Sequence, residues 1–351
     1  MWRAPAPGTV GAMDLPLSPL DRFAALGGVP AAPAADRDAR ETAYNLLSAA
    51  IGLHSALLHR ASAAERDALE KEARRLLDRE ARLPFLDGAE LRAVAEEFPE
   101  LLRSLRGRHR FGPAPAAPKP LGGEELRAVF DRALRGRLTG APREEPEALI
   151  FGGQPGSGKS TLQRALLPAL APGTVSYDGD DLMRLSPDYE AAMTADDRAA
   201  SMTLPAQVGG LHPMALEHVR EGRFDVLCSH PLGRADWAAA WTEGFREAGY
   251  RVGVAFVAAD FAESSAAIEE RYRRSRREQG FGRWMPPEHH DRFYAGVPNT
   301  AEFLETHRLA DALYVVSRDG ALLYAARLTP DGEWDKEPFA RTALEAARTR
   351  R

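Results

Sequence analysis

One octapeptide combines the residue types and the spacing of a phosphate-binding loop, GQPGSGKS at residues 153–160. The apolar run at 148–151 predicts a buried strand before it, and the leucine spacing over 161–170 predicts a helix after it. In that context the glycines let backbone N–H groups turn toward a phosphate at the helix N-terminus. Lys159 would reach the β- and γ-phosphates, and the Ser160 hydroxyl would hold Mg²⁺. The sequence therefore predicts a site for ATP or GTP formed by Gly153, Gln154, Pro155, Gly156, Ser157, Gly158, Lys159, Ser160 and Thr161.

Three aspartates follow the next predicted strand, at 174–177. In a doubly wound sheet the carboxyl ends of the strands lie beside the nucleotide, so Asp178, Asp180 and Asp181 are expected near the γ-phosphate. A carboxylate there can accept the proton of an attacking hydroxyl or help to hold Mg²⁺. The alternative is that the aspartates cap a helix at 182–185, a role that suits Asp181. We predict that Asp180 is the general base.

Arginines crowd the region from 271 to 283, which predicts a cationic helix and the loop after it. Such a helix is ordinarily a solvated surface or a nucleic-acid patch. A P-loop enzyme also needs cations around the transferred phosphoryl group, because its catalysis rests on positioning and electrostatics. We therefore predict Arg271 and Arg283 as catalytic cations beside Lys159, and assign the other arginines to the surface.

Strands alternate with helices throughout the second half of the chain. Besides the two strands already named, apolar runs predict strands at 224–228 and 251–258 and a late pair at 312–316 and 321–324. This alternation predicts an α/β fold of the P-loop kinase type, with a doubly wound, mainly parallel sheet covered by helices on both faces.

Composition and periodicity divide the whole chain into five segments. They are a disordered Pro/Ala-rich arm at 1–37, a helical bundle at 38–111, a Pro-rich linker at 112–121, the kinase-type domain at 122–330 and a C-terminal helix at 331–351. The expected architecture is thus a P-loop domain with an N-terminal helical bundle tethered by a stiff spacer.

The bulk properties restrict the class of protein. The net charge of −5 argues against nucleic acid as the main partner, and no stretch has the length and apolarity of a membrane span. The single cysteine, Cys228, suits a reducing compartment. The Met-Trp-Arg-Ala-Pro start lacks the apolar core of a signal peptide, so the expected location is the cytoplasm.

The ordered set of motifs resembles the zeta toxin family over about residues 122–330. The matching segments are the loop at 150–160, the aspartate turn at 178–180, IEERY at 268–272, GRWMP at 282–286 and VSRDG at 316–320. The P-loop alone is shared by thousands of proteins, whereas the ordered set is far more specific.

The resemblance implies a kinase that phosphorylates UDP-N-acetylglucosamine at the sugar 3′-hydroxyl, using ATP or GTP with Mg²⁺. By position it implies that Lys159 and Ser160 hold the triphosphate and the metal, that Asp180 is the base, and that Arg271 and Arg283 are lid arginines. The chain departs from the family at 228–232, CSHPL, where the family has an acidic residue, a glycine and a substrate-contacting threonine. That departure falls on the acceptor side.

Two other functions stay open. The segment YDGD at 177–180 also resembles the substrate turn of adenylyl-sulfate kinases and of antibiotic phosphotransferases, which indicates a kinase for another small hydroxylated metabolite or antibiotic. The domain would alternatively be a non-catalytic nucleotide-binding switch whose bundle recruits a partner.

The resemblance also implies a means of inhibition, because in zeta systems an antitoxin helix occupies the nucleotide site. The bundle at 38–111 is then a candidate inhibitor fused in cis, with an antitoxin in trans as the other arrangement. The plain alternative is that the bundle serves stability or dimerisation.

Overall fold

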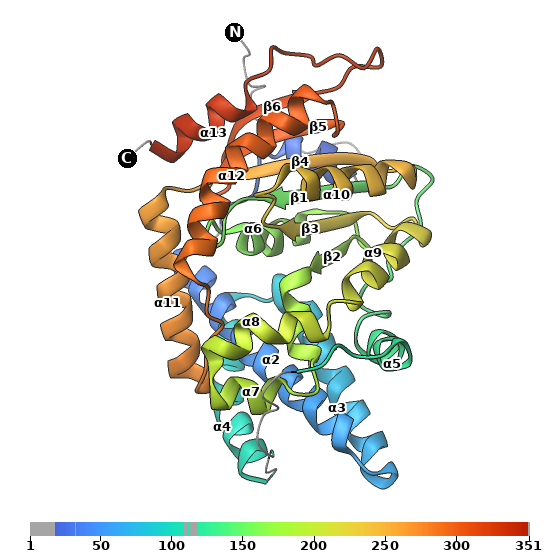
Figure 1. Cartoon of the computed structure of the whole chain (residues 1–351), viewed down its shortest axis with the longest axis vertical. Coiled ribbons are helices and arrows are strands. Elements are labelled where there is room, and N and C mark those ends of the chain that lie inside the picture. Colours follow the sequence, from blue (N-terminus) through green and yellow to red (C-terminus); the bar gives the residue numbers. More distant parts are fainter. Residues whose placement is uncertain (1–17, 32, 109–110, 112–117, 350–351) are drawn as a thin grey trace.

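A single six-stranded sheet forms the centre of the molecule (Figure 1). The computed structural model describes residues 18–31, 33–108, 111 and 118–349. The strand order is β2-β3-β1-β4-β5-β6. The strands are β1 (Glu147–Gly152), β2 (Val175–Asp178), β3 (Val226–His230), β4 (Arg251–Ala258), β5 (Ala312–Ser317) and β6 (Leu322–Arg327).

The first five strands pair in parallel, and β6 pairs antiparallel with β5 across the turn that contains Gly320. Every residue of β1 is buried, as expected for a central parallel strand covered on both faces. The predicted α/β class with a mainly parallel sheet is confirmed. The carboxyl ends of β1, β2 and β3 lie side by side, and the site is built from the segments that follow them.

Helices cover both faces of the sheet. On one face, α1 (Pro19–Ala25) and α6 (Lys159–Leu166) pack on residues such as Leu149 and Phe151. On the other face lie α10 (Ala235–Glu247), α12 (Pro287–Thr306) and α13 (Ala340–Thr349). The C-terminal helix therefore belongs to the layer that supports β4 and β5.

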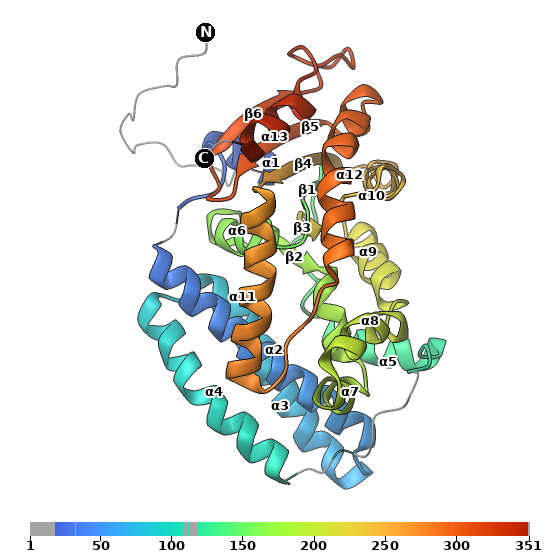
Figure 2. The same cartoon turned by 60° about the vertical axis from the view of Figure 1, so that its left-hand side comes forward.

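A helical half lies beyond the β2 edge of the sheet (Figure 1). Its N-terminal part consists of α2 (Ala34–Arg60), α3 (Ala63–Arg82) and α4 (Gly88–Arg108), and α3 starts at a capping box formed by Ser62 and Glu65. The other elements are η1 (Leu83–Phe85), α5 (Gly123–Ala133), η2 (Leu167–Ala169), η3 (Gly179–Leu185), α7 (Tyr189–Ala195), α8 (Asp197–Gln207), α9 (Leu211–Glu221) and α11 (Phe261–Gln279). Figure 2 shows α11 running from the sheet to the helical half, where it meets α2.

The prediction of a disordered arm at 1–37 is wrong for the part of it that the structure describes. Residues 19–25 form α1, whose Phe23 is fully buried and makes edge-to-face contacts with Phe151 and Tyr314. The backbone N–H of Leu20 donates to Glu147 at 2.8 Å, which satisfies a carboxylate buried in β1. Composition suggested disorder, whereas two large apolar side chains and one buried acceptor anchor the segment. Residues 1–17 and 32 lie outside the described residues.

The bundle does not form a core of its own. Its apolar residues, Leu46 and Phe98 among them, belong to the same continuous cluster as Ile150 and Val254 of the sheet. Helix α2 also contacts η3, α7 and α11, which belong to the other half. Most of the expected Pro-rich linker, residues 112–117, lies outside the described residues. Within the described part of the chain, no helix is long and apolar enough to cross a membrane.

Candidate active site

The loop between β1 and α6 has the backbone of a phosphate cradle. Gly156 and Gly158 adopt left-handed conformations, with φ of 77° and 100°. A Cβ on Gly156 would lie 2.1 Å from the Ser264 carbonyl oxygen, so only glycine lets the loop pack against α11. The loop ends at the N-terminus of α6, where free N–H groups and the helix dipole favour an anion.

Lys159 and Ser160 open α6 and contact the loop and the end of β2. The Lys159 ammonium donates to the Gln154 carbonyl at 3.0 Å, and the Ser160 hydroxyl donates to Asp178 Oδ2 at 2.5 Å. Burial lowers the pKa of Lys159 to about 8, although Asp180 and Asp178 oppose the shift. Lys159 is therefore mainly protonated at pH 7 and loses its proton at a lower pH than an exposed lysine does.

The aspartate turn after β2 places two carboxylates with opposite properties. Burial, together with the charges of Asp180 and Asp181, raises the pKa of Asp178 to about 6. Burial also acts to raise the pKa of Asp180, but the charge of Arg283, reinforced by its 2.8 Å hydrogen bond to Oδ1, holds it well below the usual range. Asp178 Oδ1 also accepts the backbone N–H of Asp180 at 3.0 Å, so the first aspartate positions the second.

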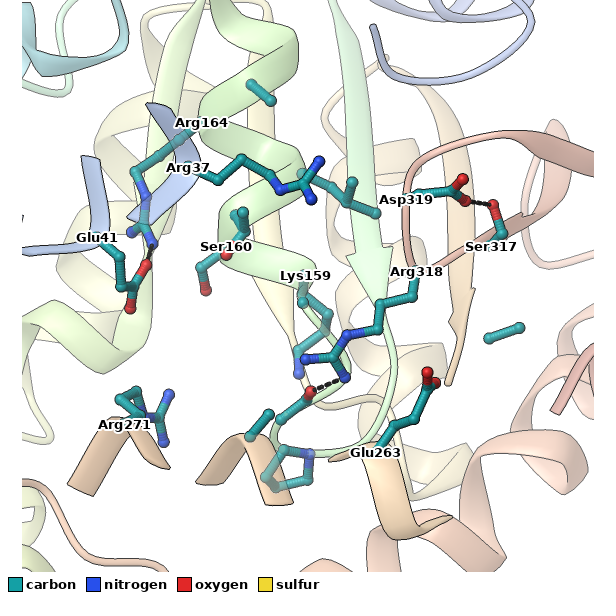
Figure 3. A pocket seen from close by; sticks show the side chains of 18 of the residues that line it. Arg37, Glu41, Lys159, Ser160, Arg164, Glu263, Arg271, Ser317, Arg318 and Asp319 are labelled. Atoms are coloured by element: carbon teal, nitrogen blue, oxygen red, sulfur yellow. Dashed lines mark hydrogen bonds and ion pairs between the residues drawn. The ribbon is translucent and has the colours of Figure 1, made fainter. Parts of the chain in front are cut away.

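A cavity of about 910 Å³ joins these groups (Figure 3). All four predicted catalytic residues, Lys159, Asp180, Arg271 and Arg283, line it. Of the predicted nucleotide-binding residues, Pro155, Gly156, Gly158, Lys159, Ser160 and Thr161 line the cavity, whereas Gly153, Gln154 and Ser157 are buried behind the loop. We call this space the donor cavity.

One buried polar atom of a cavity-lining residue fits a triphosphate in the donor cavity. Arg271 lines the cavity, and its Nε atom is buried without a hydrogen-bond partner among the described residues. Burial lowers the pKa of Arg271, and Arg283 adds to this effect. An unpaired buried donor is costly, and a phosphate oxygen would supply the acceptor that this group lacks.

Ser160 and Asp178 fit Mg²⁺, because a hydroxyl and a carboxylate are the hard oxygen ligands that this ion prefers. The end of β3 carries Ser229 rather than an acidic residue, so Asp178 supplies the carboxylate from the neighbouring strand. The described residues contain no group of three or more His, Cys, Asp or Glu side chains that could hold a metal by itself. The ion would therefore rely on the phosphates for its other ligands.

Several residues that line the donor cavity were not predicted from the sequence. Arg318, in the β5–β6 turn, donates to the Gly156 carbonyl at 2.8 Å and points into the cavity in Figure 3. Arg37 and Glu41 of α2 also line it, and Glu41 pairs with Arg164 of α6 at 3.1 Å. The VSRDG motif contains Arg318 and could have identified it from the sequence. Arg37 and Glu41 of α2 belong to no motif.

The P-loop is also tied to the C-terminal helix. Arg348 of α13 is 3% exposed, donates to Gln154 Oε1 at 2.8 Å and donates to the Tyr294 carbonyl at 2.7 Å. The Gln154 amide in turn donates to the Ala259 carbonyl and to the Ser264 hydroxyl at the start of α11. One buried network therefore joins the P-loop, the helix that carries Arg271 and the C-terminal helix.

A second cavity of about 270 Å³ borders the donor cavity at the predicted catalytic residues. It shares Lys159, Ser160, Asp180, Pro231 and Arg283 with the donor cavity. A group in one cavity would therefore face a group in the other across Lys159 and Asp180. We call this second space the acceptor cavity.

Comparison with known proteins identifies the family and the fold. The family model described as Zeta toxin matches residues 131–329, more than half of the 351 residues. Toxin zeta of Streptococcus agalactiae is 21% identical over 208 residues, which cover 59% of this chain and 71% of that protein. Toxin PezT of Streptococcus pneumoniae serotype 4 is 22% identical over 208 residues, which cover 58% and 81%.

One solved structure, from the PezAT chromosomal toxin–antitoxin system of Streptococcus pneumoniae, superposes with a TM-score of 0.55 at 19% identity. The superposition covers 65% of this chain and 89% of that one, and it shows a shared fold. The family match leaves out α1 to α4 and α13, so the residues that these helices bring to the donor cavity lie outside the matched region.

Proposed function

The chain belongs to the zeta toxin family, and we propose that it is a kinase that transfers the γ-phosphate of ATP or GTP to a hydroxyl of a small molecule. Membership in the family supports a kinase-like toxin. The observation that carries the proposal is the meeting of two cavities at Lys159, Ser160, Asp180 and Arg283. A binding switch needs a nucleotide cavity, but it does not need a second cavity that opens on a carboxylate.

The donor cavity would hold the triphosphate by its backbone and its cations. The P-loop N–H groups and Lys159 would bind the β- and γ-phosphates, while Arg271 and Arg318 approach from α11 and the β5–β6 turn. Mg²⁺ on Ser160 and Asp178 would neutralise phosphate charge when bound. Electrostatic stabilisation of this kind is the main source of catalysis in phosphoryl transfer.

Asp180 would act as the base. Its carboxylate is ionised because Arg283 stabilises the charge, and Oδ2 remains available while Oδ1 accepts from Arg283. The acceptor oxygen would form a bond to the γ-phosphorus as the bond to the β-phosphate oxygen breaks. The hydroxyl proton would pass to Asp180, and the nucleoside diphosphate would leave.

We propose UDP-N-acetylglucosamine, phosphorylated at its 3′-hydroxyl, as the acceptor. Family resemblance supports this molecule. The segment 228–232 differs from the family on the acceptor side, and it places His230 and Pro231 in the acceptor cavity. A different small hydroxylated acceptor is the second candidate, and this substitution of the loop is the observation that favours it.

The test is transfer of labelled γ-phosphate from ATP and from GTP to UDP-N-acetylglucosamine, other sugar nucleotides, NAD and aminoglycosides. Lys159→Ala serves as the blank, and Lys336→Ala is the matched surface control because Lys336 lies outside both cavities. We expect label in one acceptor with wild type and Lys336→Ala, and none with Lys159→Ala. Label in no acceptor, with nucleotide still bound, would favour the switch instead.

We also propose that an inhibitory element acts at the donor cavity, either α2 in cis or an antitoxin in trans. The solved PezAT structure belongs to a toxin–antitoxin system, which supports an antitoxin partner. In this chain α2 brings Arg37, Asp38 and Glu41 to the donor cavity. Asp38 pairs with Arg274 of α11 at 3.6 Å, so α2 also contacts the helix that carries Arg271.

Deleting the bundle would not test inhibition in cis, because its residues belong to one continuous core with the sheet and α2 packs against η3, α7 and α11, whose contact surfaces the deletion would expose. Point changes at the cavity are the better test. If α2 inhibits, Arg37→Ala with Glu41→Gln should raise the transfer rate, while His59→Ala at the exposed far end of α2 should not. A lower rate with weaker ATP binding would show that α2 builds the site.

A further inference from the structure

Helix α2 contacts both segments that carry the predicted catalytic residues. On one side, Arg164 of α6 lies over the ring of Tyr44, 4.1 Å from its centroid, and pairs with Glu41 (Figure 3). On the other side, the Tyr44 hydroxyl donates to Asp181 Oδ1 in η3. Tyr44 therefore joins the P-loop helix to the aspartate turn.

The two neighbouring carboxylates of that turn have different surroundings. Asp180 lines both cavities, whereas Asp181 and Tyr44 line neither. The carboxylate that caps η3 belongs to Asp178, so Asp181 is free to face α2 and the Arg184 guanidinium, 3.7 Å away. Because Asp180 and Asp181 are consecutive in η3, any contact that holds Asp181 also restricts the position of Asp180.

Helix α2 holds η3 at a second point. The Ser55 hydroxyl donates to the Leu185 carbonyl at 3.1 Å, at the last residue of η3. About three turns of an α-helix separate Tyr44 from Ser55, so both side chains lie on the same face of α2. Between them, Gly52 packs so closely on the Tyr189 ring that a Cβ would overlap it. The same face of α2 is therefore fitted to both ends of η3 and to the start of α7.

A buried ion pair with α3 fixes the rest of η3. Arg184 donates to both carboxylate oxygens of Glu80, to one of them at 2.7 Å, and Arg137 pairs with the same carboxylate at 3.0 Å. Burial acts to raise the pKa of Glu80, but the two arginines hold it below its usual value, so the carboxylate is ionised. Such a pair resists separation, because either charge left alone in the interior is strongly destabilising.

These contacts come from a part of the chain outside the family match. The Zeta toxin model begins at residue 131, and Tyr44, Ser55 and Glu80 all precede it. The matched region supplies Asp180, whereas α2 and α3 supply the side chains that hold the turn around it.

Taking the proposed phosphoryl transfer as its basis, we propose that Tyr44 is a positioning residue of the kinase, which acts through Asp181 to hold Asp180 in place for the acceptor hydroxyl. The helices at 34–108 are then a working part of the enzyme, because they keep the aspartate turn and the P-loop helix at a fixed spacing. This role is distinct from inhibition at the donor cavity, since Tyr44 lies outside the lining of that cavity.

The test changes the two sides of one hydrogen bond in the full chain. Tyr44→Phe keeps the ring beneath Arg164 and removes only the hydroxyl, whereas Asp181→Ala removes the acceptor. Asp181→Asn is the conservative variant, because an amide oxygen still accepts from Tyr44. Tyr324→Phe is the matched control, since the Tyr324 hydroxyl donates to Glu305 at 2.8 Å and Tyr324 lines neither cavity.

Two measurements are made on each variant, and its melting temperature shows that it is folded. Transfer of labelled γ-phosphate to the best acceptor for wild type gives kcat and the KM for ATP. Rates are compared at pH 7, where Asp178, with a pKa of about 6, is already mainly ionised. Hydrogen exchange of residues 179–185 reports how firmly the aspartate turn is held.

We expect Tyr44→Phe and Asp181→Ala each to lower kcat about 10–100-fold, with the KM for ATP within about two-fold of wild type, because a small displacement of a catalytic group affects the reacting state most. The double variant should lose no more than the larger single loss, since both residues act through one hydrogen bond. Asp181→Asn should keep most of the wild-type rate. Exchange at 179–185 should rise in Tyr44→Phe, and Tyr324→Phe should match wild type in both measurements.

Two results would overturn the inference while leaving the proposed kinase intact. One is a Tyr44→Phe enzyme with the kcat of wild type. The other is a loss in Tyr44→Phe that adds fully to the loss in Asp181→Ala, because Tyr44 would then act by a route other than Asp181. Absence of Lys159-dependent transfer in wild type is a different outcome, which would refute the kinase and, with it, this role of Tyr44.

Discussion

The donor and acceptor cavities share the predicted catalytic residues but differ in size and in the charge of their lining. The donor cavity is large, and its lining includes the cations Arg37, Lys159, Arg271, Arg283 and Arg318. The acceptor cavity is small, and besides Lys159, Asp178, Asp180 and Arg283 its lining residues carry no fixed charge. We therefore expect donor binding to depend on charge and backbone N–H groups, and acceptor binding to depend more on shape and on neutral hydrogen bonds.

Removing the cation at the junction should have the largest effect on this comparison. Arg283→Ala is expected to lower kcat about 10²–10³-fold, the usual loss for one group that stabilises transition-state charge. It should also raise the pKa of Asp180, because Arg283 is the partner that holds it down. Steady-state kinetics across pH would show both effects.

Arg277→Ala is the control for that variant, since Arg277 is an exposed arginine of α11 that pairs with Glu270. Its rate should equal that of wild type. An Arg283→Ala enzyme with normal kcat would mean that this arginine only orders the loop, and that Lys159 rather than Arg283 is the catalytic cation shared by the two cavities.

The pH dependence of catalysis should distinguish the two cavities through a smaller change in rate than that of Arg283→Ala. For kcat/KM with ATP we expect a bell-shaped profile with limbs near pH 6 and pH 8. Asp178 must be ionised, so activity falls about ten-fold per unit as the pH drops below its pKa of about 6. Lys159 must be protonated, so activity falls in the same way above its pKa of about 8.

His230, with a pKa of about 4, does not titrate in that window, so the KM for the acceptor should change there only through Asp178 and Lys159, which also line the acceptor cavity. Asp178→Asn should remove the acid limb. An acid-side change in the acceptor KM that persists in Asp178→Asn would contradict this assignment.

We expect the smallest effect from a change in α13, the helix that contacts the P-loop through Arg348. Arg348→Ala removes a buried, charge-assisted hydrogen bond to Gln154, and we expect the KM for ATP to rise about ten-fold. The KM for the acceptor and the melting temperature of the protein are measured on the same variant. Arg341→Ala, on the same helix but paired with Glu302 at the surface, is the control.

Equal changes in both KM values would argue against a specific link to the donor side. A shift confined to ATP would show that a helix outside the family match helps to position the P-loop.

The sequence predicted the donor side well because its determinants are local. One contiguous motif fixes Gly156, Lys159 and Ser160, and the ends of parallel strands must meet at one edge of a sheet, which places Asp180 nearby. Arg271 and Arg283 were identified by composition and by family resemblance, and both line the donor cavity. Their catalytic roles remain predictions.

The rest could not be predicted because it depends on long-range packing. Phe23 lies in a segment whose composition indicates disorder, and its position in the core depends on Phe151 and Tyr314, which are far away in sequence. Arg348 meets Gln154 across almost two hundred positions. His212 and His230 come from different elements and have no spacing rule, so only the fold shows that both line the acceptor cavity.

The most direct test of the central claim separates donor binding from transfer with Asp180→Asn. ATP affinity is measured by calorimetry, and transfer of labelled γ-phosphate is measured with the best acceptor found for wild type. Because Asp180 is assigned to the acceptor hydroxyl, the account predicts ATP affinity within about three-fold of wild type and transfer reduced by about 10²–10⁴-fold. Transfer at the wild-type rate would contradict the account, since Asp180 would then have no part in the reaction at the junction of the two cavities.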